Sequence, residues 1–226
     1  ILLSFSQFSC RRIHDEFPGK QWASISPEDA GFSSSQLDSF VEFIGGTGCI
    51  VRNGLMVKEW GFAGHPLDVA SAVKPVYAHI VYMSIYNKRI SSLDELVCNI
   101  DPRLSSLNPE LNFKDHKMTW RHLVTQTACY GVSEDPGTAF DYSDFQTALL
   151  IDTLVFRVYE TGYDGVDKKI LNPLLADHIR CQDYPTMNGI HVHPGRLRIS
   201  ARDFVRFGML YLKGGKWMGR QVVPSE

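Results

Sequence analysis

The chain has 226 residues, 44% of them hydrophobic and 12% aromatic, which is enough to fill one large core or two small domains sharing a cleft. Its formal net charge of −2 excludes the basic surface typical of nucleic-acid-binding proteins. The sequence contains no apolar run near the roughly 20 residues of a membrane span. Its five scattered cysteines do not follow zinc-site or disulfide-framework spacing, although a single disulfide stays open.

Two elements are predicted early in the chain. Residues 33–44 are expected to form a helix, with serines at its start, apolar residues at helical spacing and Gly45-Gly46 at its end. Residues 49–60 are expected to form a β-hairpin whose turn is Asn53-Gly54. We expect these strands to belong to a sheet that supports the following helix.

Residues 71–86 combine reactive groups with an apolar pattern. Ser71 and Lys74 stand one helical turn apart, so the hydroxyl and the amine can share a face. An amine held against an apolar wall loses its charge more readily and can activate a hydroxyl. Residues 76–86 are apolar on nearly every side, which is typical of a buried helix. Pro75 is compatible with this helix only if the helix begins at about Ser71.

A Ser-x-x-Lys match is weak by itself, since roughly one is expected by chance in such a chain. The alternative interpretation of Ser71 and Lys74 is a helix cap followed by a solvated lysine.

Further along, Thr119 is predicted to cap a helix, residues 145–158 to form a long apolar helix, and Ser200 to cap a helix over residues 204–212. A Pro-Gly loop precedes Tyr142.

Several motifs follow one another in a fixed order. They are the Asn53-Gly54 hairpin ending at Trp60-Gly61, Ser71-Ala-Val-Lys74-Pro75, Asn87-Lys-Arg-Ile-Ser-Ser-Leu-Asp94, Met118-Thr-Trp-Arg-His-Leu-Val-Thr125, Pro136-Gly-Thr-Ala-Phe-Asp-Tyr142-Ser-Asp144, and Gly195-Arg-Leu-Arg-Ile-Ser-Ala-Arg-Asp-Phe-Val-Arg-Phe-Gly208 with Gly-Gly-Lys-Trp217. From about Trp22 to the end, this series resembles the β-lactamase-related serine hydrolases, which include class C β-lactamases, D-alanyl-D-alanine carboxypeptidases and related esterases and amide hydrolases.

The resemblance implies an α/β (α+β) fold of the β-lactamase/transpeptidase type. An antiparallel sheet would be flanked by helices, and a helical subdomain containing Tyr142 would form the other side of a cleft. Residues 1–20 would be an N-terminal extension and residues 21–226 a hydrolase domain. The family's Lys/His-Ser/Thr-Gly motif is absent, so we expect a C-terminally truncated chain whose sheet is incomplete. The beginning of the chain, without Met, fits either a trimmed signal sequence or a cut end.

The resemblance also implies a role for each matching residue. Ser71 would be the acylated nucleophile, with its N–H as half of an oxyanion hole, and Lys74 its activating partner. Tyr142 would carry a proton between nucleophile and leaving group; whether Lys74 or Tyr142 is the base stays open. Ser143 and Asp144 would contact substrate. Asp144 stands where the family usually has Asn, and its charge is expected to weaken β-lactam turnover.

The expected function is therefore hydrolysis of a small-molecule amide or ester through an acyl-enzyme, without a cofactor. The alternative is a non-catalytic binding or regulatory member of the same fold. The resemblance favours an extracytoplasmic location, and the sequence leaves substrate and oligomeric state open. Three aromatic residues are candidate cleft walls: Trp60, Tyr130 and Tyr163.

Other notable residues are interpreted as structural. His191-x-His193 lacks a third ligand at a sensible spacing, so no metal site is predicted. His79 is expected to be a hydrogen-bonded core residue, and His122 to orient the loop before Tyr142. Four arginines are interpreted as a solvated basic face: Arg196, Arg198, Arg202 and Arg206.

Overall fold

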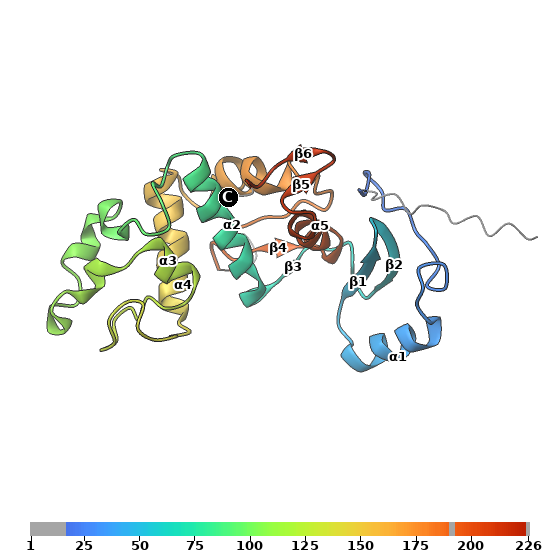
Figure 1. Ribbon diagram of the computed structural model, residues 1–226, viewed down its shortest axis with the longest axis horizontal. Helices are drawn as coiled ribbons and strands as arrows, with labels where there is room; N and C mark the ends of the chain where they lie inside the picture. The colour runs from blue at the N-terminus through green and yellow to red at the C-terminus, as the bar shows by residue number, and fades with distance from the viewer. Residues whose placement is uncertain (1–16, 190–192, 225–226) are drawn as a thin grey trace, which may run out of the picture. The chain divides into compact units, whose positions relative to one another are not determined.

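The structure is a computed structural model that describes residues 17–189 and 193–224 (Figure 1). It divides into two compact units between Ala63 and Gly64. The predicted N-terminal extension is described only from residue 17 onward. Throughout the described ranges, every helix is too short or too polar to cross a bilayer.

The first unit contains the predicted helix. α1 spans Ser34–Ile44, the Ser33 side chain caps its start, and Gly45 follows its last residue. Its buried residue Leu37 packs in a small core with Ala30 and Val57. The prediction for residues 33–44 is confirmed.

The predicted hairpin is also present in this unit. β1 (Gly48–Arg52) and β2 (Leu55–Trp60) pair antiparallel. Asn53 and Gly54 have φ values of 52° and 82°, the positive values that a type I′ turn requires at both central positions. The hairpin predicted from Asn53-Gly54 is therefore confirmed.

In the second unit, α2 begins later than predicted. β3 (Leu67–Asp68) leads into a 3₁₀ turn at Ala70–Val73, and α2 spans Lys74–Tyr86. Pro75 has no N–H to donate to the Ser71 carbonyl, so an α-helix cannot start at Ser71 without losing that bond. Instead the Lys74 N–H donates to the Ser71 carbonyl, and the tighter turn carries the chain into the helix.

The predicted burial of α2 is confirmed. Val76, Ile80 and Val81 are completely buried, and the helix contacts α3, α4 and the helical segment Asp167–Ala176. After the helix the backbone becomes left-handed at Lys88, with φ of 58°, whereas Asn87 has φ of −80°.

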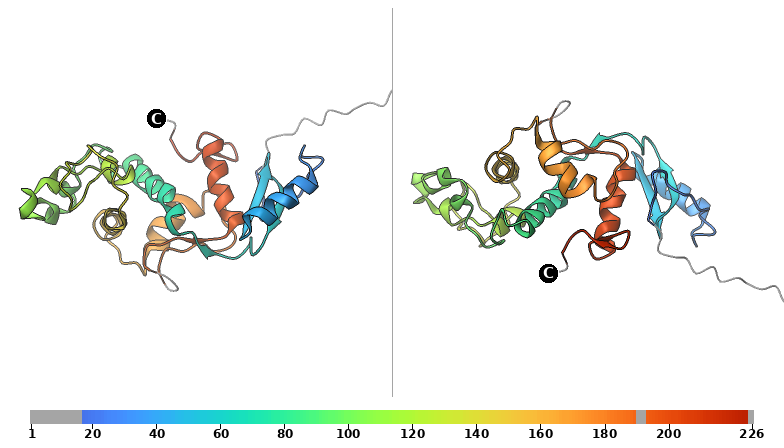
Figure 2. Two further views of the ribbon diagram at one scale, coloured as in Figure 1. Left: turned by 90° about the horizontal axis from the view of Figure 1, so that it is seen from below. Right: turned by 90° about the horizontal axis from the view of Figure 1, so that it is seen from above.

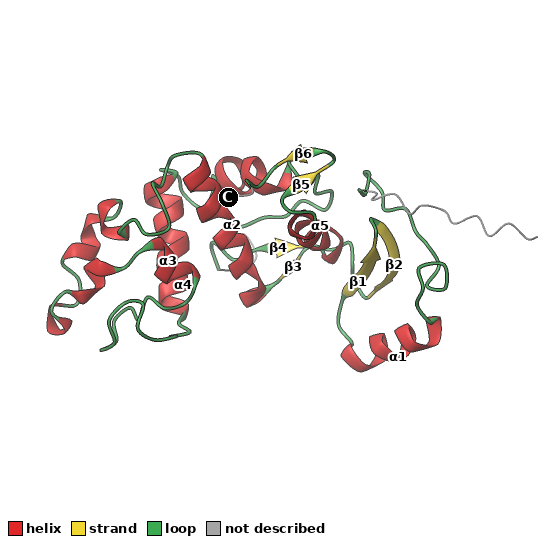
Figure 3. Ribbon diagram, viewed as in Figure 1, coloured by secondary structure: helices red, strands yellow, loops and turns green. Residues whose placement is uncertain are grey.

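Helices are the main regular structure of the second unit (Figure 3). Besides α2 they are α3 (Trp120–Val124), α4 (Asp144–Thr153), a π-helical continuation at Leu154–Val158, a second π-helical segment at Asp167–Ala176, and α5 (Ala201–Leu212). Short 3₁₀ turns occupy Val97–Asn99, Pro102–Ser105, Pro109–Leu111 and Lys114–Lys117. The predicted caps Thr119 and Ser200 are confirmed for α3 and α5. α3 and α4 lie side by side in the views of Figures 1 and 2.

The predicted single sheet is not found within the described residues. The strands form three separate antiparallel pairs: β1 with β2, β3 with β4 (Arg198–Ile199), and β5 (Lys216–Trp217) with β6 (Arg220–Gln221). The pairs of the second unit are two residues long, because β3 runs into the turn at Ala70 and β4 into the cap of α5. The single sheet was expected from the resemblance, and strands this short lack the alternating β-prone runs that would identify them in the sequence.

The interpretation of the arginines as a solvated face is wrong for Arg206, whereas Arg196 remains partly exposed. Arg206 is fully buried on α5, with Nε 3.3 Å from Oδ1 of the equally buried Asp203. Arg196 pairs with Asp68, Nη2 lying 2.7 Å from Oδ2. Asp203 stands only three positions from Arg206, but Asp68 is 128 positions from Arg196 and could not be recognised from the sequence as its partner.

Candidate active site

Ser71, Lys74 and Tyr142 converge in the second unit. Ser71 lies exposed in the 3₁₀ turn, Lys74 is the first residue of α2, and Tyr142 arrives two residues before α4. Lys74 Nζ lies 3.1 Å from Ser71 Oγ and 2.8 Å from Tyr142 Oη, and Tyr142 Oη lies 2.5 Å from Ser71 Oγ. Each of the three polar groups thus hydrogen-bonds to the other two.

Lys74 shapes the electrostatics of this triangle. Its hydrogen bond lowers the pKa of Tyr142 below the ordinary value near 10, because an ammonium beside the oxygen favours the phenolate; the bond to Ser71 acts in the same direction. Lys74 Nζ also lies 4.4 Å from the Tyr142 ring centroid. Lys74 is half-buried, so the apolar enclosure expected from the sequence is incomplete. A phenol beside an ammonium can exchange a proton with Ser71.

Three hydrogen bonds hold the loop that delivers Tyr142. Gln146 is completely buried, its Nε2 donates to the Asp141 carbonyl, and its Oε1 accepts from the Ala128 N–H at 3.2 Å. The Asp141 N–H donates to the Gln126 carbonyl at 2.9 Å. These bonds fix the residue immediately before Tyr142.

His122 supports the same loop. Its Nδ1 accepts from the Thr119 N–H at 3.2 Å in the capping box of α3. A Cβ on Gly137 would come within 2.8 Å of His122 Nε2, so the loop packs against the ring. This geometry agrees with the predicted structural role of His122.

A cleft of about 480 Å³ opens beside the triangle. Ser71, Lys74 and Asp144 line it, whereas Ser143 is the N-cap residue of α4 and is absent from the lining. Asp144 lies in the first turn of α4 and opposes the lowering of the Tyr142 pKa by its negative charge. Of the three candidate wall residues, Tyr163 lines this cleft.

Sequence reasoning missed further residues of the cleft. Asp152 lines the cleft and accepts a 2.5 Å hydrogen bond from the Tyr163 hydroxyl, and Arg196 and His193 line the cleft as well. Asp152 follows Asp144 by eight positions, a helical spacing that puts both on one face and could have identified it. Arg196 and His193 carry no such signal, because only the tertiary fold brings them to Ser71.

The histidines singled out in the sequence lie in different surroundings. His79 is buried, with Nε2 2.9 Å from the Leu174 carbonyl and Nδ1 3.0 Å from the Tyr211 hydroxyl, which confirms a hydrogen-bonded core histidine. His191 lies outside the described residues. Among residues 17–189 and 193–224, His, Cys, Asp and Glu side chains do not cluster in threes suited to a metal.

Comparison with known proteins identifies the fold. No family model and no curated protein sequence matches the chain. Among solved structures, the chain is similar to "Putative 6-aminohexanoate-dimer hydrolase from Bacillus anthracis", with a TM-score of 0.66 and 17% identity over 94% of this chain and 67% of that one. It is also similar to "putative beta-lactamase from Bacteroides dorei", with a TM-score of 0.62 and 17% identity over 88% of this chain and 67% of that one. The chain has a β-lactamase-like hydrolase fold.

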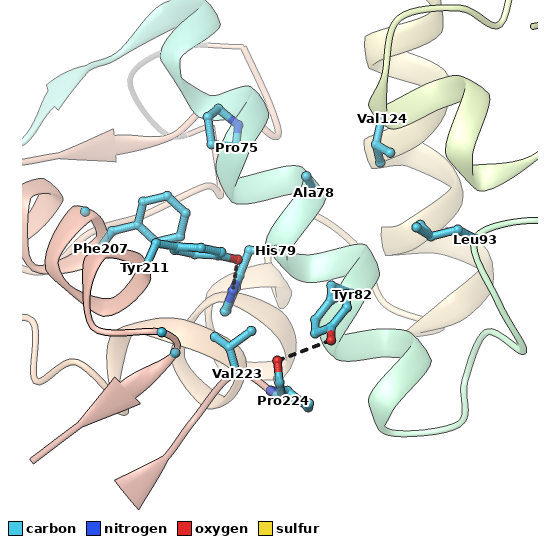
Figure 4. Close-up of a pocket in the computed structure, with 13 residues that line it drawn as sticks. Pro75, Ala78, His79, Tyr82, Leu93, Val124, Phe207, Tyr211, Val223 and Pro224 are labelled. Carbon is cyan, nitrogen blue, oxygen red and sulfur yellow. Dashed lines mark hydrogen bonds between the residues drawn. The ribbon is translucent and has the colours of Figure 1, made fainter. Parts of the chain in front are cut away.

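The β-lactamase-like fold of this chain contains a second cavity, of about 740 Å³, with a mostly apolar lining (Figure 4). α2 contributes His79 and Tyr82, and α5 contributes Phe207 and Tyr211. The Tyr82 hydroxyl donates to the Pro224 carbonyl at 3.2 Å. Ser71, Lys74 and Tyr142 are absent from its lining, so the nucleophile faces the smaller, more polar cleft.

Proposed function

We propose that this protein is a serine hydrolase that transfers the acyl group of a small amide or ester to Ser71 and then to water. The observation that carries the proposal is the triangle of hydrogen bonds among Ser71, Lys74 and Tyr142 at the edge of the cleft. The fold shared with two proteins described as hydrolases is consistent with it.

In the proposed mechanism, Tyr142 is the base and Lys74 remains an ammonium. The lowered pKa of Tyr142 supports this division of roles, because its main cause is the hydrogen bond from Lys74. As Ser71 Oγ attacks the carbonyl carbon, its proton passes to the Tyr142 oxygen. The negative charge that develops on the carbonyl oxygen would face the Ser71 N–H, which has no intrahelical acceptor at the start of a helix.

Collapse of the tetrahedral intermediate completes acylation. The bond to the leaving group breaks, and the departing nitrogen or oxygen takes the proton from Tyr142, which leaves an ester on Ser71. A water molecule then repeats the sequence: it gives a proton to Tyr142, attacks the ester carbon and expels Ser71 Oγ, which recovers the proton.

A covalent probe tests the proposal. Incubation with a fluorescent fluorophosphonate, followed by peptide mass spectrometry, is expected to place the label on the Ser71 peptide. Ser71→Ala should be unlabelled, whereas Ser133→Ala, which removes another exposed serine, should label like the wild type. Tyr142→Phe should label about 10²–10⁴-fold more slowly. Folded wild-type protein without label would instead favour the non-catalytic alternative.

A further inference from the structure

The residue immediately before Ser71 has an unusual backbone conformation. Ala70 has φ of 46°, in the left-handed region that residues other than glycine rarely occupy. Ala70 lines the cleft beside Ser71. Such a conformation persists only where neighbouring contacts hold it.

Asp68 supplies that contact. Its Oδ1 accepts a 2.8 Å hydrogen bond from the Ala70 N–H and a 3.1 Å bond from Arg196 Nε, while Arg196 Nη2 lies 2.7 Å from Oδ2. A two-pronged arginine–carboxylate pair fixes geometry as well as distance. One carboxylate therefore links the strained residue to a wall of the cleft.

The carbonyls of the residues on either side of Arg196 both accept hydrogen bonds. The Tyr77 hydroxyl of α2 donates to the Gly195 carbonyl at 2.7 Å. The Val69 N–H donates to the Leu197 carbonyl at 3.1 Å, next to the β3–β4 pairing. The segment that carries Arg196 is thus hydrogen-bonded to residues on both sides of Ser71, namely Val69 and Tyr77.

We infer that Asp68 and Arg196 are a positioning pair for the nucleophile. They hold Ala70 in its left-handed conformation and so aim the N–H and Oγ of Ser71 at an acyl group in the cleft. Their effect reaches the reaction through Ala70, without contact with the reacting atoms. The inference rests on the proposed function for its consequence in catalysis, whereas the backbone contact itself can be tested without turnover.

Variants of the full chain separate the two interactions of Asp68. Asp68→Ala removes both the Ala70 contact and the ion pair. Asp68→Asn keeps a side-chain oxygen for the Ala70 N–H but loses the ion pair. Asp94→Ala is the matched control, because Asp94 forms the same two-pronged pair with Arg121, at 2.7 and 2.9 Å, on the surface.

The first measurement is the rate constant for fluorophosphonate acylation at saturating probe, per labelled molecule. We expect Asp68→Ala to lower it by about 10- to 100-fold, because small displacements of a nucleophile are costly. Asp68→Asn should fall in between, and Asp94→Ala should match the wild type. The half-saturating probe concentration and the pH midpoint of labelling should not change. A purely structural role would instead lower the fraction that labels and the melting temperature, at an unchanged rate.

The second measurement is a crystal structure of Asp68→Ala. Ala70 is expected to leave the positive-φ region and Ser71 Oγ to move away from Tyr142 Oη. An unchanged φ at Ala70, or acylation at the wild-type rate, would overturn the inference. If the wild-type protein is not labelled by the probe, the proposed function is overturned but the inference about Ala70 is not. The crystal structure of Asp68→Ala then decides whether Asp68 holds Ala70 in its left-handed conformation.

Discussion

At the scale of single residues, the charges around Tyr142 set the expected pH dependence. Lys74 lowers the pKa of Tyr142, and the carboxylate of Asp144 raises it again in part. The resemblance singled out Asp144, because the β-lactamase-related serine hydrolases usually have Asn at the matching position, and the geometry gives that difference a physical consequence. The carboxylate reduces the fraction of Tyr142 that is phenolate at neutral pH.

Asp144→Asn is therefore expected to shift the pH profile. A base must be deprotonated, so acylation should rise with pH through the pKa of Tyr142, at a midpoint below 10. Removing the negative charge lowers that pKa further, so the rising limb should move to lower pH and acylation near neutral pH should increase. The measurement is the rate of probe labelling against pH, with Asp135→Asn as a control outside the cleft. Superimposable profiles for Asp144→Asn and wild type would contradict the assignment.

At the scale of elements, α2 combines a reactive residue at its start with a buried apolar surface along the rest of its length. Its first residue is Lys74, and the remaining helix is so apolar that it is buried on several sides. His79 and Ser84 are buried polar residues of this helix, and burial lowers the pKa of His79 to about 4. Because a carbonyl can only accept, Nε2 must donate to Leu174, and the neutral ring accepts from the Tyr211 hydroxyl at Nδ1.

His79 should consequently contribute to acid sensitivity. The folded state takes up this proton only near pH 4, whereas the unfolded chain does so near 6.5. The free energy of unfolding should thus fall as pH falls from 6.5 to 4, by up to about 3 kcal/mol, since one pKa unit is worth about 1.4 kcal/mol.

Urea unfolding at several pH values tests this expectation. His79→Gln, which cannot titrate, should show a flatter dependence between pH 6.5 and 4 than the wild type. His116→Gln, at an exposed position, should retain the wild-type slope. An equal slope in His79→Gln and wild type would assign the acid sensitivity to other groups.

At the scale of the whole molecule, long-range contacts bring Tyr142 to Ser71. The two are 71 positions apart in the chain. Tyr142 lies in the loop between α3 and α4, and both of these helices contact α2. Gln146 is central to this arrangement, because it satisfies backbone groups on both sides of the loop from inside the core.

Gln146→Leu is expected to loosen the Tyr142 loop. The free energy of unfolding should drop by about 1–3 kcal/mol for each backbone group left unsatisfied, namely the Ala128 N–H and the Asp141 carbonyl. Labelling of Ser71 should slow even where the protein remains folded, because the base is displaced. Gln36→Leu, the same change at an exposed position of α1, is the control for both measurements. Labelling at the wild-type rate in folded Gln146→Leu would show that Tyr142 is held by other contacts.

The sequence by itself determined the elements whose causes are local. The helix over α1, the Asn53-Gly54 hairpin, the caps Thr119 and Ser200 and the burial of α2 all follow from neighbouring residues. The order of motifs also led from Ser71 and Lys74 to Tyr142, although their catalytic roles remain predictions.

Only the tertiary structure decided what depends on residues far apart in the chain. It divides the strands of the described residues into three short pairs, brings Arg196 to Asp68 and brings Tyr142 to Ser71. The physical reason is that hydrogen bonding and charge pairing act through space. A hydrophobic period, a turn pair or a capping residue acts within a few positions, so it can be recognised before the chain has folded.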